Sequence, residues 1–271
     1  MVANDLEGRS ARNILSLSGG KDSAALAVYL RDRVERLEYV FCDTGEEMKE
    51  TYEYLERLEV HLGQPIIRLN PDRPFSHYLQ LYGGMLPDAR TRWCTRMLKI
   101  RPFERYVGRD SVVNFIGIRA DEKRKGYISA KPNIEPRYPF IEEGVIKDDV
   151  LRILQESGLG LPSYYRWRSR SGCYFCFFQQ RIEWVGLLEN HPDLFRKALR
   201  YEKENPVTGE RYTWNERESL GELACPARIQ RIKEEHLRRL QMGHRTLKFR
   251  LLDLLDDEAN DQNDACLICR L

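Results

Sequence analysis

The sequence has 271 residues, of which 42% are hydrophobic and 32% are charged. This length exceeds one average domain without requiring two independent cores. No apolar run approaches the roughly 20 residues of a membrane-spanning helix, and the first residues lack a signal-peptide pattern, so we expect a soluble cytoplasmic protein with no membrane partner. The formal net charge of +2 gives no overall indication of nucleic-acid binding.

The first elements predict a strand, a tight loop and a helix. An apolar run from Asn13 to Leu17 leads into Gly19 and Gly20, and good helix formers follow from Ala24 to Leu30. A second apolar run, Leu37 to Cys42, precedes a helix expected from Glu46 to Leu62.

The later elements continue the alternation of strands and helices. Further strands are expected over residues 65–70 and 112–118, and an amphipathic helix over residues 148–157. From Trp184 onward the pattern is mainly helical, and residues 256–264 form an acidic, polar stretch expected to be a mobile tail. The order predicts an α/β fold, with a doubly wound, mostly parallel sheet and a helical C-terminal extension.

The loop from Ser18 to Ser23 has the chemistry of an anion site. Its two glycines allow the backbone to approach an anion, and the N-terminus of the following helix favours negative charge. Ser18 and Ser23 add hydroxyl groups, and Asp22 is a candidate to hold Mg²⁺ or to orient the loop. The spacing differs from a Walker A loop, and an ordinary strand-to-helix turn with a serine cap is the alternative interpretation.

The segment Ser16-Leu17-Ser18-Gly19-Gly20-Lys21-Asp22-Ser23 resembles the ATP-pyrophosphatase loop. That loop is found in argininosuccinate synthetases, tRNA thiolation enzymes and phosphoadenylyl-sulfate reductases. The resemblance implies contact with the pyrophosphate of ATP or with the phosphosulfate of an adenylyl sulfate.

Further segments, in order along residues 12–180, resemble the phosphoadenylyl-sulfate (PAPS) reductase family, including the sulfurtransferase subunit of DNA phosphorothioation systems. They are Asp43-Thr44-Gly45, Trp93-Cys94-Thr95-Arg96, Gly117-Ile118-Arg119 and Gly172-Cys173-Tyr174-Phe175-Cys176. The resemblance implies a fold like that of the adenine nucleotide alpha-hydrolases. We expect a nucleotide-binding domain over residues 1–180, including the Cys-x-x-Cys pair, and a helical region with a polar tail over residues 181–271.

The same resemblance assigns the site. The expected catalytic residues are Lys21, Asp22, Asp43 and Arg119. The expected nucleotide-binding residues are Ser16, Ser18, Gly19, Gly20, Lys21, Asp22, Ser23, Asp43, Lys99, Gly117, Arg119 and Arg124. Arginine can pair bidentately with phosphate and lysine adds a point charge, whereas a solvated basic face is the alternative.

The cysteines suggest a metal centre. Cys173 and Cys176 lie on one turn, an arrangement typical of zinc or of one edge of an iron–sulfur cluster. Reductases that carry a [4Fe–4S] cluster have a Cys-Cys pair before this motif, and here Cys94 is followed by Thr95 instead. Cys225 is the predicted fourth ligand, with a tail cysteine, an external ligand or no ligand as alternatives. Cys266 and Cys269 match the family's C-terminal Glu-Cys-Gly-Leu-His motif poorly.

These observations favour an enzyme that activates a substrate by adenylylation with ATP and Mg²⁺ and transfers sulfur with a [4Fe–4S] cluster. Zinc is the alternative metal. The rival functions are adenylyl-sulfate or PAPS reduction and a non-catalytic accessory protein that binds nucleotide and zinc. A cysteine desulfurase is a candidate sulfur donor. A nucleic acid is a candidate substrate, since Trp93, Trp167, Arg166 and Arg168 offer stacking rings and cations.

Overall fold

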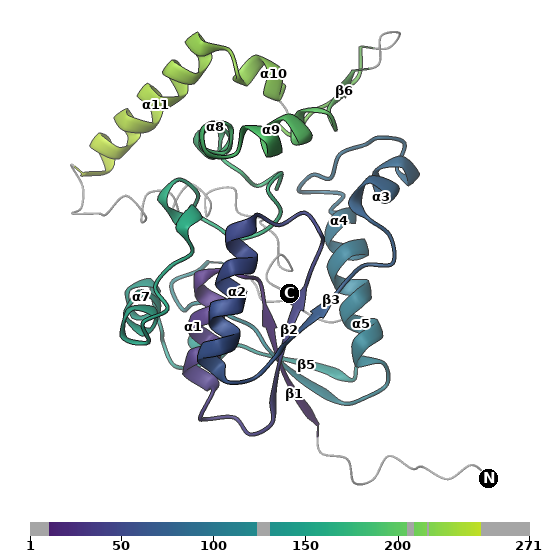
Figure 1. Cartoon of the computed structure of the whole chain (residues 1–271), viewed down its shortest axis with the longest axis vertical. Coiled ribbons are helices and arrows are strands. Elements are labelled where there is room, and N and C mark those ends of the chain that lie inside the picture. Colours follow the sequence, from purple (N-terminus) through teal and green to yellow (C-terminus); the bar gives the residue numbers. More distant parts are fainter. Residues whose placement is uncertain (1–10, 124–130, 205–208, 216, 245–271) are drawn as a thin grey trace.

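A computed structural model of the chain describes residues 11–123, 131–204, 209–215 and 217–244 (Figure 1). Its centre is a five-stranded sheet in the order β3-β2-β1-β4-β5, in which all paired neighbours are parallel. The strands are β1 Arg12–Leu17, β2 Leu37–Cys42, β3 Ile66–Leu69, β4 Val112–Phe115 and β5 Ile134–Arg137. The predicted parallel α/β fold is therefore confirmed.

Helices cover both faces of this sheet. Figure 1 shows α1 (Lys21–Leu30), α2 (Lys49–Leu62) and α7 (Lys147–Glu156) on one side and α5 (Arg101–Val107) on the other. Each face has its own apolar cluster, with Leu15 and Leu17 in one and Ile14 in the other, because successive strand residues point to opposite faces. Burial on both faces explains why these strands read as nearly continuous apolar runs.

Three details differ from the sequence-based expectation. β5 was not predicted; it is a short edge strand that contains Pro136, a residue tolerated at a sheet edge. Helix α2 begins at Lys49 instead of Glu46, because residues 43–48 form a loop in which the Asp43 carboxylate accepts the Gly45 N–H group at 2.9 Å. No element was predicted over residues 90–106, which fold into short helices: α4 Trp93–Thr95, a π-helical turn Arg96–Ile100 and α5.

A helical layer lies beyond the carboxyl ends of the strands, as Figure 1 shows, and it confirms the predicted helical extension. Its elements are α8 Arg181–Asn190, α9 Pro192–Leu199, the hairpin strands β6 Lys203–Glu204 and β7 Arg211–Tyr212, α10 Leu220–Leu223 and α11 Pro226–His244. The remaining short elements are α3 Phe75–Leu81, α6 Pro139–Glu142 and the 3₁₀ turn Ser163–Arg166.

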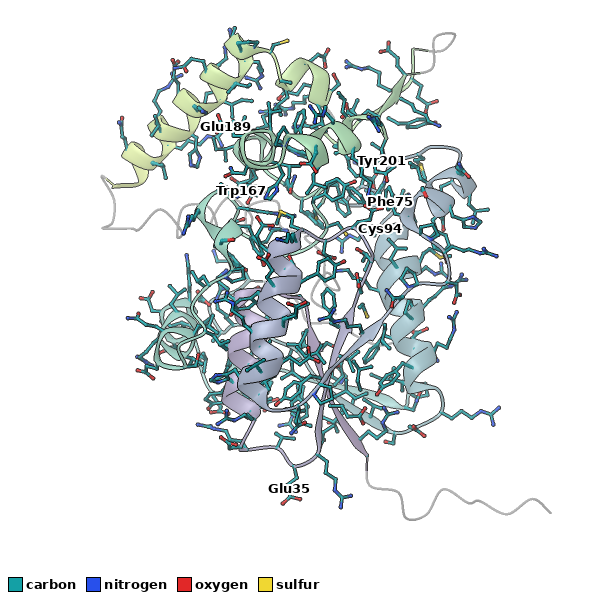
Figure 2. All side chains as sticks on the ribbon, in the orientation of Figure 1. Glu35, Phe75, Cys94, Trp167, Glu189 and Tyr201 are labelled. Carbon is teal, nitrogen blue, oxygen red and sulfur yellow. The ribbon has the colours of Figure 1, made fainter. Side chains whose placement is uncertain are left out.

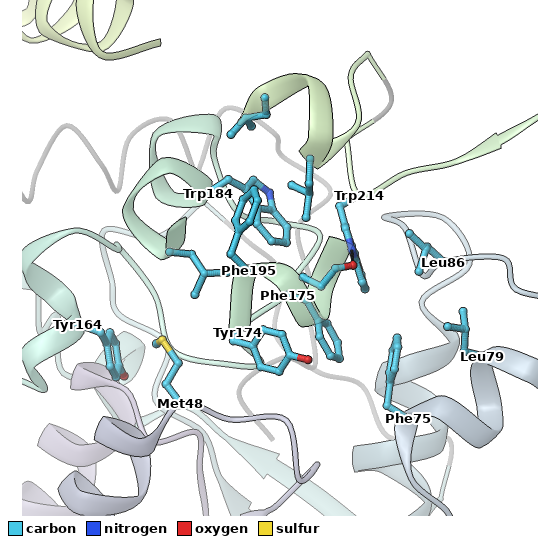
Figure 3. Close-up of a cluster of buried hydrophobic side chains, with 14 of the residues drawn as sticks. Met48, Phe75, Leu79, Leu86, Tyr164, Tyr174, Phe175, Trp184, Phe195 and Trp214 are labelled. Atoms are coloured by element: carbon cyan, nitrogen blue, oxygen red, sulfur yellow. Dashed lines mark hydrogen bonds between the residues drawn. The ribbon is translucent and has the colours of Figure 1, made fainter. Parts of the chain in front are cut away.

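An aromatic cluster joins this layer to the rest of the chain (Figure 3). The ring centroids of Phe75, from α3, and Phe175 are 4.3 Å apart. Phe175 also stacks on Trp214, with 4.9 Å between the ring centroids. Trp184 of α8 is fully buried in the same cluster. Side chains from both sides of residue 180 thus share one apolar core, while the division of the chain at that residue stays a prediction.

Candidate functional site

The glycine loop connects β1 to α1. The Ser18 N–H group donates to Ser23 Oγ at 3.1 Å, and the Ser23 hydroxyl donates to the Gly20 carbonyl at 3.2 Å. Gly19 has φ +70°, and a Cβ atom there would lie 2.5 Å from Cγ2 of Thr51. The backbone therefore requires glycine at position 19, and the N-terminus of α1 points into a compact loop.

Three hydroxyl groups from residues 164–171 lie directly on this loop. Tyr164 donates to the Gly19 carbonyl at 2.8 Å, and the Tyr165 hydroxyl accepts the Lys21 N–H group at 3.1 Å. The Ser171 hydroxyl donates to Ser18 Oγ at 3.2 Å. We call Tyr164, Tyr165 and Ser171 the roof of the loop.

Buried charges surround the start of α1. Asp22 accepts a hydrogen bond from Arg119 at 2.8 Å, and Arg119 also pairs with Asp121 at 2.8 Å and Glu122 at 3.5 Å. The Lys21 ammonium lies 3.6 Å from Asp22. Because the Lys21, Asp22 and Arg119 side chains are all less than 5% exposed, this network fixes the orientation of Asp22.

Two further predicted residues, Gly117 and Ser16, lie against the backbone of the loop and inside the sheet, respectively. At Gly117, a Cβ atom would lie 3.0 Å from the backbone of Asp22, so the chain after β4 packs tightly against α1 and delivers Arg119. Ser16 donates to the Asn114 side chain at 2.8 Å inside the sheet. Arg124 lies outside the described residues.

Asp43 stands at the end of β2. Its Oδ1 atom accepts the Gly45 N–H group and also the Tyr52 hydroxyl at 2.7 Å. Burial and the neighbouring Asp43 carboxylate raise the pKa of Tyr52. Asp43 is partly exposed, so its carboxylate is held in position yet remains accessible to solvent.

The loop after Asp43 carries a second, buried carboxylate. Glu47 accepts a hydrogen bond from the Thr44 hydroxyl at 3.1 Å, and burial raises the pKa of Glu47. Cys173 lies close by, with its Sγ atom 3.2 Å from Thr44 Oγ1 and 3.8 Å from Glu47 Oε1. The Tyr174 N–H group donates to the Glu46 carbonyl at 2.9 Å, which attaches the Cys173–Cys176 turn to this loop.

Three of the four predicted metal ligands line one cavity of about 40 Å³. They are Cys94, Cys173 and Cys176, and the wall also includes Lys99 and Ser171. Burial raises the pKa of Cys94 to about 12 and that of Cys173 well above its ordinary value. Figure 2 shows Cys94 near Phe75, at the junction between the sheet layer and the upper helices.

Lys99 is buried in the wall of this thiol cavity. Burial alone would lower its pKa, but the nearby Glu47 carboxylate holds the pKa of Lys99 above its ordinary value. Its surroundings are therefore the cysteines, while its predicted contact with the nucleotide stays a prediction.

Cys225, the fourth predicted ligand, does not line the cavity. It is exposed at the junction of α10 and α11, with its Sγ atom 3.8 Å from the Gly221 carbonyl. Cys266 and Cys269, like the polar stretch 256–264, lie outside the described residues. Cys42 is buried on β2, and burial raises its pKa to about 12.

The three cavity cysteines are suitable donors for a metal, but their side chains are not arranged closely enough around one point to bind it. Sulfur donors suit zinc and iron–sulfur clusters, and Cys94, Cys173 and Cys176 share one largely apolar wall. Among the described residues, however, no group of three or more His, Cys, Asp or Glu side chains is close enough to hold a metal ion. A bound metal or cluster would therefore require these side chains to reorient around it.

The expectation that Trp93 and Arg168 contact a nucleic acid is wrong. Trp93 is 2% exposed and stacks between Phe75 and Tyr82. Arg168 is completely buried and donates to the carbonyls of Gly172 and Cys173 at 3.2 and 2.8 Å. Neither side chain is available to a nucleic acid, and Arg168 instead stabilises the backbone at Gly172 and Cys173.

Arg166 and Trp167 lie nearer the surface. Arg166 is exposed and Trp167 is partly buried. Arg166 borders an open groove of about 1050 Å³ between α2 and residues 161–166. Its other lining residues include Glu53, Arg57 and Tyr165.

The roof residues were missed in the sequence. Tyr164 and Tyr165 are more than 140 positions from the loop they contact, and no local periodicity reports such a contact. A signal was nevertheless present, because hydroxyl residues are concentrated in Ser163-Tyr164-Tyr165 and Ser169-Arg170-Ser171, between the Gly/Pro turn and the Cys-x-x-Cys pair.

Comparisons with known proteins give both sequence and structural relatives. Residues 12–135 match the family model described as the phosphoadenosine phosphosulfate reductase domain. An uncharacterized protein of Methanocaldococcus jannaschii, MJ0066, is 29% identical over 198 residues, which cover 68% of this chain and 40% of the relative. A second protein of that organism, MJ0973, is 26% identical over 194 residues, which cover 67% of this chain and 45% of the relative.

The chain thus spans less than half the length of these two relatives. An uncharacterized 37.8 kDa protein from the gpa 5′ region of Escherichia phage 186 is 24% identical over 266 residues, which cover 75% of this chain and 78% of the relative.

Two solved structures resemble the chain distantly. The phosphoadenylyl-sulfate reductase of Candida auris, in complex with phosphate, has a TM-score of 0.49 and 11% identity, covering 62% of this chain and 83% of the reductase. The U34-tRNA thiolase NcsA of Methanococcus maripaludis, with its [4Fe-4S] cluster, has a TM-score of 0.42 and 15% identity, covering 82% of each chain. None of the helices in the described part of this chain is long and apolar enough to cross a membrane.

Proposed function

Since residues 12–135 match the model of the phosphoadenosine phosphosulfate reductase domain, we propose that this protein binds ATP, adenylylates a substrate and transfers sulfur to it. One observation carries the proposal: Ser171 hydrogen-bonds to the glycine loop and also lines the cavity of Cys94, Cys173 and Cys176. The glycine loop, as the proposed phosphate site, and the cysteine cavity therefore adjoin, which supports a reaction that combines a nucleotide with sulfur.

The glycine loop would bind the pyrophosphate of ATP. Backbone N–H groups at the start of α1 favour an anion, and the Lys21 side chain adds positive charge beside them. Asp22 and Asp43 offer carboxylates for Mg²⁺, which would neutralise charge on the departing pyrophosphate. An oxygen of the acceptor would attack the α-phosphorus and release pyrophosphate, and a sulfur nucleophile would then displace AMP.

The cavity cysteines would serve the sulfur step. Cys94, Cys173 and Cys176 would hold a [4Fe–4S] cluster, or zinc as the alternative, with Cys225 as a fourth ligand only if its helix junction moved. When bound, a cluster would supply iron able to ligate sulfur. Phe175 and Trp214 line the same wall and would limit water, while Lys99 would place a positive charge beside the sulfur.

A pyrophosphate-release assay tests the proposal. Purified protein is incubated with ATP and Mg²⁺ and a panel of acceptors including RNA and DNA, with a cysteine desulfurase as sulfur source. Asp22→Asn is expected to abolish release, because it removes the buried charge paired with Arg119. The matched control Asp32→Asn, on an exposed side chain, is expected to retain wild-type release. Release that survives Asp22→Asn would contradict the proposal.

The family match also favours one alternative, reduction of an adenylyl sulfate. That reaction uses no ATP and requires a cysteine thiol that attacks the sulfate sulfur, for which Cys266 is the candidate. Sulfite formed from adenylyl sulfate or PAPS, and lost in Cys266→Ser, would establish it. A protein that binds nucleotide and zinc but releases neither product without a partner would instead have an accessory role.

A further inference from the structure

The Tyr165 hydroxyl occupies a position that an oxygen of an anion bound to the loop would take. The Tyr165 oxygen lies 3.1 Å from the Lys21 nitrogen, which is the usual distance between a backbone N–H donor and an oxygen acceptor. Lys21 is the first residue of α1, where helices bind phosphate. A Cβ atom at Gly20 would lie 2.5 Å from Ser171 Oγ and 3.1 Å from the Tyr165 oxygen, so roof and loop are in close contact.

A phosphate oxygen and the Tyr165 hydroxyl cannot both take this place. The backbone N–H group of Lys21 has a single hydrogen atom to donate, and the Tyr165 oxygen already accepts it. The Lys21 ammonium, which lies 3.6 Å from Asp22, also makes a cation–π contact with the Tyr165 ring, 5.2 Å from the ring centre. Tyr165 therefore competes with phosphate for two groups of the same lysine.

We propose that the Tyr165 hydroxyl closes the nucleotide-free glycine loop by standing in for a phosphate oxygen, and that a phosphate group displaces it, together with the adjoining Ser171 hydroxyl, when it binds. The inference rests on the proposed role of the loop as a phosphate site. It adds that part of the binding energy is used to open the roof, so that ligands without a phosphate leave the loop closed.

The movement is local, because the rest of the roof segment is anchored. Tyr164 and Arg168 are completely buried, and Ser169 donates two hydrogen bonds to the buried Glu183 carboxylate at 2.6 and 2.7 Å. Tyr165 is 5% exposed and, unlike these residues, borders the open groove of about 1050 Å³ beside α2. This groove offers room for the ring to turn outward while the backbone stays in place.

The movement also reaches the second site. Ser171 contacts Ser18 on one side and lines the thiol cavity on the other, two residues before Cys173. Displacement of Ser171 by phosphate would therefore change the wall of the cavity only when a nucleotide is present.

Calorimetric titration of the full chain with inorganic pyrophosphate tests the proposal. Tyr165→Phe keeps the ring and removes only the competing oxygen, so pyrophosphate is expected to bind about two- to tenfold more tightly, the equivalent of one neutral hydrogen bond. Tyr54→Phe is the matched control. The Tyr54 hydroxyl donates to the Gly160 carbonyl, at 3.0 Å, and not to the glycine loop, so this variant is expected to bind pyrophosphate with wild-type affinity.

The outcomes separate the two claims. Unchanged or weaker binding by Tyr165→Phe, with normal wild-type binding, would overturn the roof proposal alone. Absence of pyrophosphate and ATP binding by the wild type would overturn the proposed phosphate site, and this inference with it. A second measurement uses protein labelled with 3-fluorotyrosine: the resonance that disappears in Tyr165→Phe should shift when pyrophosphate is added to wild type, and a stationary resonance would also overturn the proposal.

Discussion

Replacement of Glu183 by glutamine should destabilise the protein strongly, although the two side chains have nearly the same shape. The Glu183 carboxylate is completely buried in α8. One oxygen accepts the N–H and hydroxyl groups of Ser169, at 2.6 and 2.7 Å, and the other accepts the Gln180 N–H group at 2.9 Å. All three partners are donors in this arrangement, so the site requires an acceptor at both positions.

A glutamine amide supplies only one acceptor. Whichever way the amide is turned, its NH₂ group faces a backbone N–H group of Ser169 or Gln180 and leaves it without a partner. Loss of a hydrogen bond to a charged group costs about 1.5–3 kcal/mol of unfolding free energy. For a chain of this size, that corresponds to a decrease in melting temperature of roughly 3–12 °C.

Scanning calorimetry of Glu183→Gln beside Glu189→Gln measures this effect. Glu189 lies on the same helix but is half exposed, and its ion pair with Lys233 should contribute less than about 1 kcal/mol. A melting temperature for Glu183→Gln within 1 °C of the Glu189→Gln value would refute the reasoning, because it would mean that the buried carboxylate does not hold the Ser169 segment.

Three further predictions concern the glycine loop, β2 and the thiols. Gly19→Ala should abolish pyrophosphate binding measured by calorimetry, because both its φ of +70° and its close neighbour disfavour a Cβ atom; Gly63→Ala has a similar φ of +67° but open space, and should bind normally. Burial raises the pKa of Cys42 to about 12 from an ordinary value of 9.0, so its neutral thiol favours the folded state below pH 9 and this contribution is lost as pH rises from 9 toward 12. Urea unfolding should therefore show that the free energy of unfolding decreases less between pH 8 and pH 11 in Cys42→Ala than in wild type. An equal decrease in both proteins would contradict this prediction. Anaerobically purified Cys225→Ala should retain the metal and sulfide content of wild type, whereas Cys94→Ala should lose it; loss in both variants would make Cys225 a ligand.

The fold was predictable where the signal is local. The run from Asn13 to Leu17, the glycine pair and the helix after it follow one another within 18 residues, and the structure has them as β1, loop and α1. β5 was missed because Ile134–Arg137 is short, contains proline and alternates poorly, so its place in the sheet depends on pairing with β4. Long-range pairing of this kind leaves no periodic pattern in one sequence.

The site divides in the same way. Residues of the glycine loop could be selected from chemistry and spacing, but the surroundings of Lys99 and Arg168 could not. Lys99 follows Cys94 on a short π-helical turn that directs it inward to the thiols, and Arg168 satisfies carbonyls of the turn it precedes. From sequence alone, a lysine or arginine is expected to be exposed to solvent or to bind a ligand. A buried cation cannot be predicted in this way, because it depends on the carboxylates and carbonyls that the fold brings next to it.

These buried cations also explain how two sites with opposite requirements can adjoin. A loop that binds phosphate attracts anions, whereas burial raises the pKa of Cys94 and Cys173 and so favours their neutral form. Arg168 supports the turn that carries Ser171 and Cys173: it donates to the Gly172 and Cys173 carbonyls and is completely buried beside Met48. It holds the backbone from Ser171 to Cys173 in a fixed path, so that the hydroxyl of Ser171 faces the loop while the thiol of Cys173 faces Thr44 and Glu47. Because one turn presents both groups, displacement of the Ser171 hydroxyl by phosphate at the proposed site would change the wall of the cysteine cavity without movement of the sheet.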